Sequence, residues 1–445
     1  MTEVYIEDTV QGIKSAVNSI LNQIERSGNS VLKESKEVYI KVNGIDFKKH
    51  TYTSPEVLEA VILYLKEKGA KIFVMENSTQ GNITRLVFTI TGYKQICDKH
   101  GVNIIYLDEE ETQSFEFSGK VSKDKDPKGY NLMTFRLPKT IVHIIDNRDS
   151  LTYINIPKLK THSMGVVTLS LKNQWGFPIH KDRGKDHNFN LHSKLVDVYE
   201  LIKPDIALID GIEGTVNGHY PPTAWEDRLV VPFNILIGGT DPLAVDVVGA
   251  RVFGLTIKEI PHLKIAFERG LGEGNLNKIE VIGKDLNEYK EKYEWDLLQE
   301  FPENVRIIKG KKLLCREGCQ NNPLTVLQTL AYDHSEKFNG GWFIVMGKGH
   351  DGDLIDQLKH EGYTKGLVAG YCAIEEVGQK LRKEFGRRKV FFSNDCNNLA
   401  ETVTAELKLS SMSALDLAPL PLEQIMKHIQ EAQRHGTTSL ITTAF

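Results

Sequence analysis

The sequence has no long apolar segment, little net charge and no low-complexity tract. No apolar run approaches the roughly 18 residues that a membrane-spanning helix needs, so we expect no membrane partner. A net charge of −4 over 445 residues gives no sign of nucleic-acid binding. The first residues, MTEVYIEDTV, lack the basic stretch and apolar core of a signal peptide, and we therefore expect a cytoplasmic protein.

Cysteine is scarce as well, with five residues in the whole chain. Thiols of a cytoplasmic protein stay reduced, which argues against a disulfide framework. Cys97 falls inside a predicted helix, where a small apolar side chain is expected to pack in a core. The other four cysteines all belong to the C-terminal third of the chain.

The sequence does contain a repeated alternation of strand and helix patterns. EVYIKV (37–42), IFVMEN (72–77) and VNIIYLD (102–108) are typical of buried strands, and predicted helices at 54–71 and 84–101 separate them. This order favours parallel strands joined by right-handed crossovers. Further strands are predicted at 140–146, 151–157, 206–214 and 278–283.

The length of the chain favours two or three domains. A charged stretch at 284–310 precedes a second series of strands and helices, which includes a predicted strand at 311–315. We predict an α/β fold with a mainly parallel sheet sandwiched by helices in residues 1–310, followed by a smaller α/β domain in residues 311–445. Residues 109–136 are polar and predict irregular structure or a short antiparallel excursion.

The segment INIPKLKTHSMGVVTLSLKNQWG (154–176) concentrates cationic and hydrogen-bonding groups. These groups belong to Lys158, Lys160, His162, Lys172 and Asn173. The first three alternate with a period of two, so an extended chain places them on one side. They follow a predicted strand, and ligands of open α/β sheets bind beyond the carboxyl ends of strands. The segment therefore predicts a site for a carboxylate, phosphate or diphosphate.

Positive charge continues beyond this segment. Residues 157–194 hold seven Lys/Arg and two Asp, a local charge of +5 in a chain of −4. We expect three of the lysines to be solvated: Lys181, Lys185 and Lys194. Three histidines leave a metal site open as an alternative, although their spacing fits no common ligand pattern: His180, His187 and His192.

Other predicted strand ends are expected to converge on the same place. Asp210 and Glu213, in the glycine-rich DGIEG phrase, are candidate acid/base or cation-binding groups. Four further residues are candidate substrate ligands because they follow strands: Asn77, Gly239, Thr240 and Asp241. Asp241 also occupies the position of an ordinary helix N-cap.

These phrases together resemble a bacterial and archaeal family, domain of unknown function family 362 (DUF362). IPKLKTH…LKNQWG, KPD…DGIEG and GTDPLAVDVVGA occur in the family's order, and SPEVLEAVILYLKEKGAKIFVMEN and RLVFTITGY also look like it. The likeness covers roughly residues 36–275. The chain departs at Val42, where the family usually has the proline of a Lys-Pro-Asn phrase, and at the loop ending NGHYPP.

The resemblance implies an association with redox chemistry, since many members of the family append a ferredoxin-like module. This chain lacks the C-x-x-C-x-x-C-x-x-x-C-P run of such modules. A ferredoxin-type cluster therefore cannot be carried over from the family.

The four C-terminal cysteines nevertheless mark predicted strand ends. Cys315 follows KKLL, Cys372 follows GLVAGY and Cys396 follows VFFSND, with Cys319 four residues after the first. Parallel strands would bring these thiols to one edge of a sheet. Four thiolates predict a 4Fe–4S cluster, and zinc is the alternative metal. The alternative without a metal is that the cysteines pack in the core of the domain.

The combined prediction is an iron–sulfur enzyme, an oxidoreductase or lyase, that acts on an anionic small molecule. The predicted catalytic residues are Lys158, Lys160, His162, Asp210 and Glu213. Two alternatives stay open: a non-redox isomerase or lyase using Lys/His acid–base chemistry, and an electron-transfer or metal-delivery protein. A redox partner protein and a homo-oligomer are further candidate assemblies.

Overall fold

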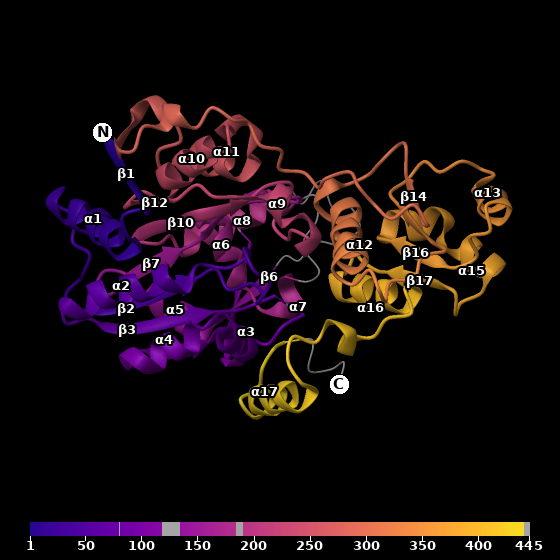
Figure 1. The fold of residues 1–445 in the computed structure, drawn as a ribbon, viewed down its shortest axis with the longest axis horizontal. Helices are drawn as coiled ribbons and strands as arrows, with labels where there is room; N and C mark the ends of the chain where they lie inside the picture. Colours follow the sequence, from indigo (N-terminus) through magenta and orange to yellow (C-terminus); the bar gives the residue numbers. More distant parts are fainter. Residues whose placement is uncertain (80, 118–133, 184–189, 440–445) are drawn as a thin grey trace.

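A computed structural model of the protein describes residues 1–79, 81–117, 134–183 and 190–439. These residues form two α/β parts, each built on its own sheet (Figure 1). The larger sheet is mostly parallel and is flanked by helices on both faces, and the smaller sheet belongs to the C-terminal region. The predicted fold class is confirmed.

The larger sheet has eleven strands among the described residues. Its main path runs, in spatial order, through β13 (Ile279–Gly283), β1 (Thr2–Asp8), β12 (Ile235–Gly239), β10 (Ile206–Thr215), β7 (Thr152–Ile156), β2 (Glu37–Val42), β3 (Lys71–Glu76) and β4 (Asn103–Tyr106). The five strands from β10 to β4 are parallel, so their carboxyl ends share one edge. Strand β12 runs antiparallel to both of its neighbours, β1 and β10.

Two apolar cores cover the two faces of this sheet. One core packs beneath α1 (Ile13–Arg26), α2 (Pro55–Glu67), α3 (Thr84–Thr91) and α4 (Tyr93–His100). The other packs beneath α5 (Lys139–Asp146), α8 (Leu191–Leu201), α10 (Pro242–Val252) and α11 (Pro261–Glu268). The predicted helix at 84–101 is divided at Gly92, whose φ of +88° ends α3 in a left-handed conformation.

The stretch at 140–146, predicted as a strand, is instead part of the helix α5. Ile141 and Ile144 are its buried residues and lie three positions apart, which is a helical spacing. A short apolar run does not distinguish a strand from one helical turn, and tertiary packing decided this case. The short antiparallel excursion is confirmed for β5 (Thr112–Glu116) and β6 (Thr134–Pro138), while the residues between 117 and 134 lie outside the described part.

Short elements extend the carboxyl edge of the large sheet. They are β8 (Lys158–His162), β9 (Val166–Thr168), α6 (Ser170–Asn173), α7 (His180–Arg183), α9 (Glu226–Leu229) and β11 (Val230–Val231). Strand β8 continues directly from β7 and pairs with β10, so that Lys158 lies opposite Asp210. All five residues of β8 are buried, which encloses the predicted lysine–histidine row in the protein.

The smaller sheet has four parallel strands in the order β14 (Val305–Lys309), β15 (Trp342–Met346), β16 (Gly366–Ala369) and β17 (Val390–Ser393). Helices α12 (Asn321–Asp333) and α16 (Leu399–Leu409) pack on one face, and α13 (Leu354–His360) and α15 (Gln379–Phe385) on the other. The strand predicted at 311–315 is wrong: only Leu313 there forms an isolated bridge. Strand β14 precedes residue 310 yet belongs to this sheet, and the division into domains stays a prediction.

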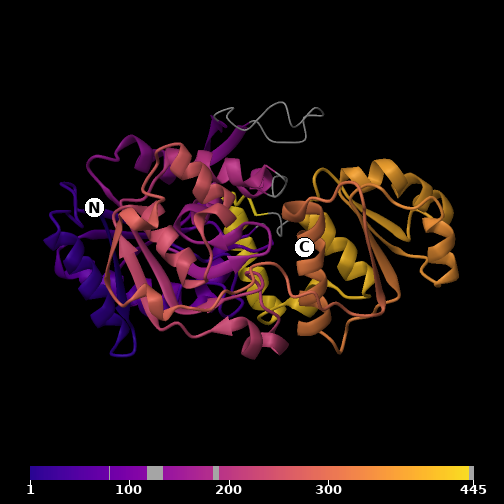
Figure 2. The same cartoon turned by 90° about the horizontal axis from the view of Figure 1, so that it is seen from above.

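The chain finally returns to the larger part. Helix α17 (Leu422–Arg434), at the yellow end of the colour bar, contacts α3 (Figure 1). Figure 2 shows this yellow helix against the larger part of the protein. Ile425 and Ile429 pack there against Ile83 and Leu86. Across the described residues, every helix is too short or too polar to traverse a bilayer.

Candidate functional site

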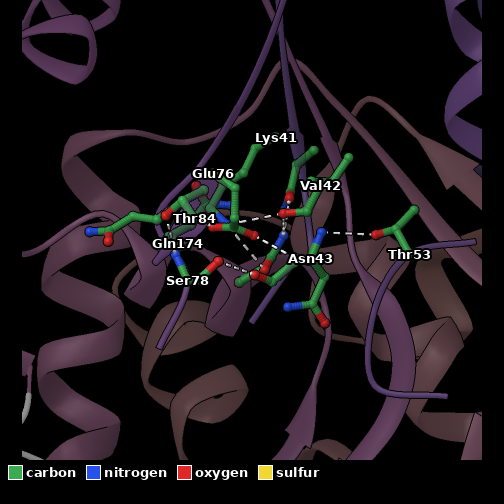
Figure 3. Close-up of polar contacts among 12 residues, drawn as sticks. Lys41, Val42, Asn43, Thr53, Glu76, Ser78, Thr84 and Gln174 are labelled. Carbon is green, nitrogen blue, oxygen red and sulfur yellow. Dashed lines mark hydrogen bonds and ion pairs between the residues drawn. The ribbon is translucent and has the colours of Figure 1, made fainter. Parts of the chain in front are cut away.

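The carboxyl ends of β2 and β3 meet around a buried ion pair (Figure 3). The Nζ atom of Lys41 lies 2.7 Å from Oε1 of Glu76, and each side chain is 1% exposed. Glu76 also accepts hydrogen bonds from the backbone N–H groups of Gly44 and Asn77 at 2.7 and 2.8 Å. Burial lowers the pKa of Lys41, and the charge of Glu76 opposes that effect. This lysine is therefore neutralised by the fold itself.

The amide of Asn173 connects this ion pair to the neighbouring strand β7. Its Oδ1 accepts from Nζ of Lys41 at 3.3 Å, and its Nδ2 donates to Oδ1 of Asn155 at 2.7 Å. Helix α6, which carries Asn173, begins where both carboxylate oxygens of Asp246 accept backbone N–H groups at 2.7 Å. Burial raises the pKa of Asp246 to about 8. Asp246 thus anchors the helix that positions Asn173.

Lys158 is a second buried lysine with carboxylate partners. Its Nζ lies 3.2 Å from Oδ2 of Asp210 and 3.8 Å from Oε1 of Glu213. Glu213 reaches outward to Nδ1 of His50 at 2.6 Å, and these two side chains are 32% and 19% exposed. Burial alone would raise the pKa of Glu213, but the hydrogen bond from His50 and the charge of Lys158 leave it lowered. The same hydrogen bond raises the pKa of His50. These groups form a charged chain from the interior to the surface.

Lys160 differs because it has no carboxylate partner among the described residues. Its side chain is fully buried, and its Nζ donates to the main-chain oxygen of Thr51. Burial and the positive charges of Lys172 and Lys158 lower its pKa well below the usual range. Thr168 and Thr215 flank Lys160 in the sheet, and neither hydroxyl has a hydrogen-bond partner in the described part. A buried cation is thus bordered by unsatisfied hydroxyls.

Lys172 is more isolated still. The side chain is buried, and no described residue forms a hydrogen bond or ion pair with its Nζ. Burial and the nearby charge of Arg183 lower the pKa of Lys172 to about 7. Arg183 in turn donates only to oxygens of Asn77 and Ser78 within the described residues, and burial lowers its pKa to about 10. Among the described residues, the site therefore holds more buried basic side chains than carboxylates.

His162 ends the predicted row beside a second histidine. Its ring stacks on that of His219 with centroids 3.7 Å apart and planes 3° apart. Nδ1 of His162 accepts the backbone N–H groups of Met164 and Gly165 at 3.1 and 3.2 Å, which leaves the proton of the neutral ring on Nε2. The ring and the stem of Lys172 both lie within 4 Å of the point where a Cβ atom on Gly165 would sit. The cationic residues of the predicted site are thus brought together.

The predicted ligand Asn77 also lies at this edge. Its Oδ1 accepts from Nη2 of Arg183 at 3.0 Å, and its Nδ2 donates to the main-chain oxygen of Pro178 at 3.3 Å. Close by, the ring of His180 contacts the main-chain oxygen of Ser78 at 2.9 Å and the hydroxyl of Thr438 at 3.2 Å. The C-terminal segment therefore borders this part of the site.

The predicted convergence of Gly239, Thr240 and Asp241 on the lysines is wrong. Because β12 runs antiparallel to β10, Gly239 pairs with Ala207 near the amino end of β10, away from Asp210 and the residues that follow it. Asp241 accepts backbone N–H groups of α10 at 3.1 and 3.2 Å, which is the ordinary N-cap role.

The expected solvated lysines divide into two cases. Lys181 is exposed, whereas Lys194 is fully buried with its Nζ 5.8 Å from the ring centre of Phe117. The prediction for Lys194 is wrong because almost all of α8 is buried in the core. Lys185 and His187 lie outside the described residues. His192 pairs with His262, their Nδ1 atoms 3.0 Å apart.

The four C-terminal cysteines gather at the carboxyl edge of the small sheet. Burial and the proximity of the other three thiols, Cys315, Cys396 and Cys372, raise the pKa of Cys319 well above its usual range. A Cβ atom on Gly370 would lie 2.3 Å from Sγ of Cys319, so only glycine leaves room for that sulfur. None of the cysteines forms a disulfide. In the described part of the chain, no three His, Cys, Asp or Glu residues are arranged as a group that could hold a metal ion.

The cysteine loop abuts the lysine site through one buried amide. Nδ2 of Asn321, two residues after Cys319, donates to the main-chain oxygen of Ser163 at 2.5 Å and to Oδ1 of Asp296 at 2.8 Å. Ser163 directly follows His162 in the sequence. Trp225 and Tyr332 also contact one another across the two parts, with ring centroids 4.3 Å apart. The cations and the thiols therefore lie on two sides of one interface.

Comparison with known proteins assigns this region to a family. Residues 38–251, which include every lysine described above, match the family model "Domain of unknown function (DUF362)". The chain carries a DUF362 domain. The resemblance predicted from the sequence is confirmed over those residues.

Two individual proteins are also similar to this chain. A thylakoid-associated protein of Synechocystis sp. is 28% identical over 271 residues, which cover 58% of this chain and 75% of that protein. A crystal structure of a Thermotoga maritima protein aligns with 89% of this chain and 82% of its own at 13% identity and a TM-score of 0.38, a likeness too weak to support an argument. The cytoplasmic location stays a prediction.

The structure adds site residues that we do not predict from the sequence. They are His50, Glu76, Asn155, Arg183 and His219. Glu76 had a usable signal, because an acidic residue at the end of a buried strand requires a cation. The other four residues had no such signal in the sequence, because their partners come from distant segments.

Proposed function

We propose that the DUF362 domain is the substrate-binding part of an enzyme that acts on an anionic small molecule. One observation carries the proposal: Lys160 and Lys172 are buried lysines without a carboxylate partner in the described residues. Burying a cation is costly unless it is paired. Lys41 and Lys158 meet that requirement with Glu76 and Asp210, whereas the other two amines have no such partner in the described part of the chain, and an anionic ligand would supply one.

The surrounding groups favour a carboxylate or phosphate ligand. The unsatisfied hydroxyls of Thr168 and Thr215 border Lys160, and the buried side chain of Asn43 has no hydrogen-bond partner among the described residues. Ammonium, hydroxyl and amide donors together match the several acceptor oxygens of such anions. The Asp210–Lys158–Glu213–His50 chain can supply or remove a proton near the bound molecule.

For the reaction of this enzyme, we first propose redox chemistry through an iron–sulfur cluster. The donor set supports it: burial and the three other thiols raise the pKa of Cys319, and a bound metal would supply the positive charge that stabilises its thiolate. Cys315, Cys319, Cys372 and Cys396 would hold the cluster, and it would supply electrons across the interface to a molecule at the lysines. Zinc in the same set would be structural.

A non-redox isomerase or lyase is the second candidate. It is favoured by the lowered pKa of Lys160, which makes a neutral amine base available, beside cations that can stabilise an oxyanion. The third candidate function, an electron-transfer or metal-delivery protein, would use only the cysteines and not the lysine site. For each of these candidate functions, a redox partner protein and a homo-oligomer stay proposals.

Anion binding is tested by titration calorimetry with sulfate, phosphate and succinate at pH 6. We expect wild type to bind at least one of them and Lys160→Met to lose at least tenfold in affinity, about the 1.4 kcal/mol of one charge-assisted contact. Lys181→Met removes an exposed lysine of the same region and should bind like wild type. Equal affinity in all three proteins would contradict the proposal.

The cluster is tested separately by anaerobic purification and analysis of iron, sulfide and zinc. About four irons and four sulfides per chain, lost together in Cys319→Ser, support the redox version. One zinc per chain supports a structural site. Protein without either metal, still binding the anion, favours the isomerase or lyase.

A further inference from the structure

Among the described lysines of the site, Lys172 has surroundings that suit covalent chemistry. Its amine has neither a carboxylate nor a hydrogen-bond acceptor in the described residues, whereas Lys41, Lys158 and Lys160 each donate to an oxygen. An amine that serves only to hold charge is expected to have such partners. The amine of Lys172 has no such partner in the described residues, which suits it to act as a nucleophile.

The backbone around Lys172 fixes its position. Two N–H groups at the start of α6 donate to the buried carboxylate of Asp246, and the next residue, Asn173, is tied to Lys41 and Asn155. The stem of Lys172 runs over Gly165, where a Cβ atom would lie 2.7 Å from its Cε. The amine is therefore positioned by contacts on its helix, not by a bond to its own nitrogen.

The groups that face Lys172 are cationic or neutral. The positive charge of Arg183 lowers the pKa of Lys172. The charge of Lys172 in turn lowers the pKa values of Lys160, His192 and His262. The ring of His162 lies within 4 Å of the same point, where a Cβ atom on Gly165 would sit. With no carboxylate beside it in the described part of the chain, the amine has a pKa lowered to about 7 and is largely unprotonated above neutral pH.

We propose that Lys172 forms a Schiff base with a carbonyl substrate that also carries a carboxylate or phosphate, the anion being held by Lys160. This inference rests on the proposed function, because the same anion site orients the carbonyl. The Nζ lone pair attacks the carbonyl carbon to form a C–N bond. The carbonyl oxygen takes up the two amine protons and leaves as water, so that C=N replaces C=O.

The iminium formed by one further protonation would act as an electron sink for the adjacent carbon. The substrate class is therefore a 2-oxo acid or a phosphorylated ketone or aldehyde. Reaction at the adjacent carbon also needs a base. The neutral ring of His162 is not that base, because its Nδ1 accepts two backbone N–H groups and its Nε2 carries the proton.

The test is borohydride trapping in the intact protein at pH 7.5. Three probes are incubated one at a time with sodium borohydride: pyruvate, glyoxylate and dihydroxyacetone phosphate. The hydride reduces C=N to a stable secondary amine, and peptide mass spectrometry locates it. We expect at least one probe to label Lys172 at least about tenfold more than the exposed Lys181, because the lowered pKa of Lys172 keeps much of its amine neutral at this pH.

Two matched variants complete the experiment. Lys172→Arg keeps a long basic side chain but removes the amine nucleophile and should abolish the dominant adduct, while Lys181→Arg should retain it. Wild-type mapping needs no variant, so a folding defect cannot hide the outcome. Labelling spread evenly over exposed lysines, or absent from Lys172 with all three probes, overturns the inference. If sulfate or phosphate still binds through Lys160, the proposed function survives that result; if neither binds, both fail.

Discussion

Replacing Lys172 with methionine should stabilise the protein below neutral pH. Methionine has a similar length and flexibility, carries no charge and fills the path over Gly165. Wild type must keep an amine in a buried place where no described carboxylate compensates it. The substitution removes that cost without leaving a partner unpaired, in contrast to Lys158→Met, which would strand Asp210.

The sign and size follow from the lowered pKa of this lysine. Between pH 7 and 10.5 the unfolded chain binds a proton at Lys172 that the folded chain has lost, so wild-type stability rises with pH across this window. The slope contributed is at most about 1.4 kcal/mol per pH unit, which gives an upper bound of about 5 kcal/mol for the full window. Below pH 7 the whole penalty applies, and Lys172→Met should then be more stable by up to that amount.

Urea unfolding at several pH values between 6 and 9 measures this effect. The quantity of interest is the difference in unfolding free energy between wild type and Lys172→Met, because other titrating groups cancel. We expect that difference to shrink as pH rises, and Lys181→Met to show no such trend. A variant that is less stable than wild type at pH 6, or a difference independent of pH, would refute the reasoning.

Three further outcomes follow from the same contacts. Glu76→Gln leaves Lys41 as an unpaired buried charge and should cost about 3–5 kcal/mol in urea unfolding, with part of the loss recovered by adding Lys41→Met. Gly370→Ala should cost more than about 1 kcal/mol, since residue 370 has φ +80° and a Cβ there would collide with Sγ of Cys319. Ile429→Ala should cost about 2–5 kcal/mol in thermal or urea unfolding if α17 is docked on α3, and no loss would show that it is not.

Local sequence patterns were sufficient for most of the fold. Strands β2, β3 and β7 are rich in apolar residues and largely buried, and the sequence of α2, between β2 and β3, has Pro55 in its first turn. The misassigned helix α5 is only eight residues long, so its apolar pattern could not distinguish the spacing of a helix from that of a strand. Strand direction was not predictable either, since no local signal shows that β12 reverses.

The sequence predicted which basic residues belong to the candidate site, but not the ion pairs and hydrogen bonds that connect them. The period of two in β8 correctly grouped Lys158 and Lys160, whose amines both reach residues 51–54. Which lysines are neutralised depends on Glu76 and Asp210, and these come from other strands. The burial of Lys194 likewise follows from packing that a charged residue in a polar segment does not reveal.

Proton uptake on anion binding tests the central claim most directly. Sulfate, which does not itself titrate near neutral pH, is added to wild type at pH 8 by calorimetry in buffers of different ionisation enthalpy. If Lys160 and Lys172 hold the anion, the mostly neutral Lys172 must become charged, and its protonation contributes an uptake of at most about 0.9 proton. Lys172→Met should therefore take up fewer protons than wild type. Sulfate binding without proton uptake in wild type would contradict the account.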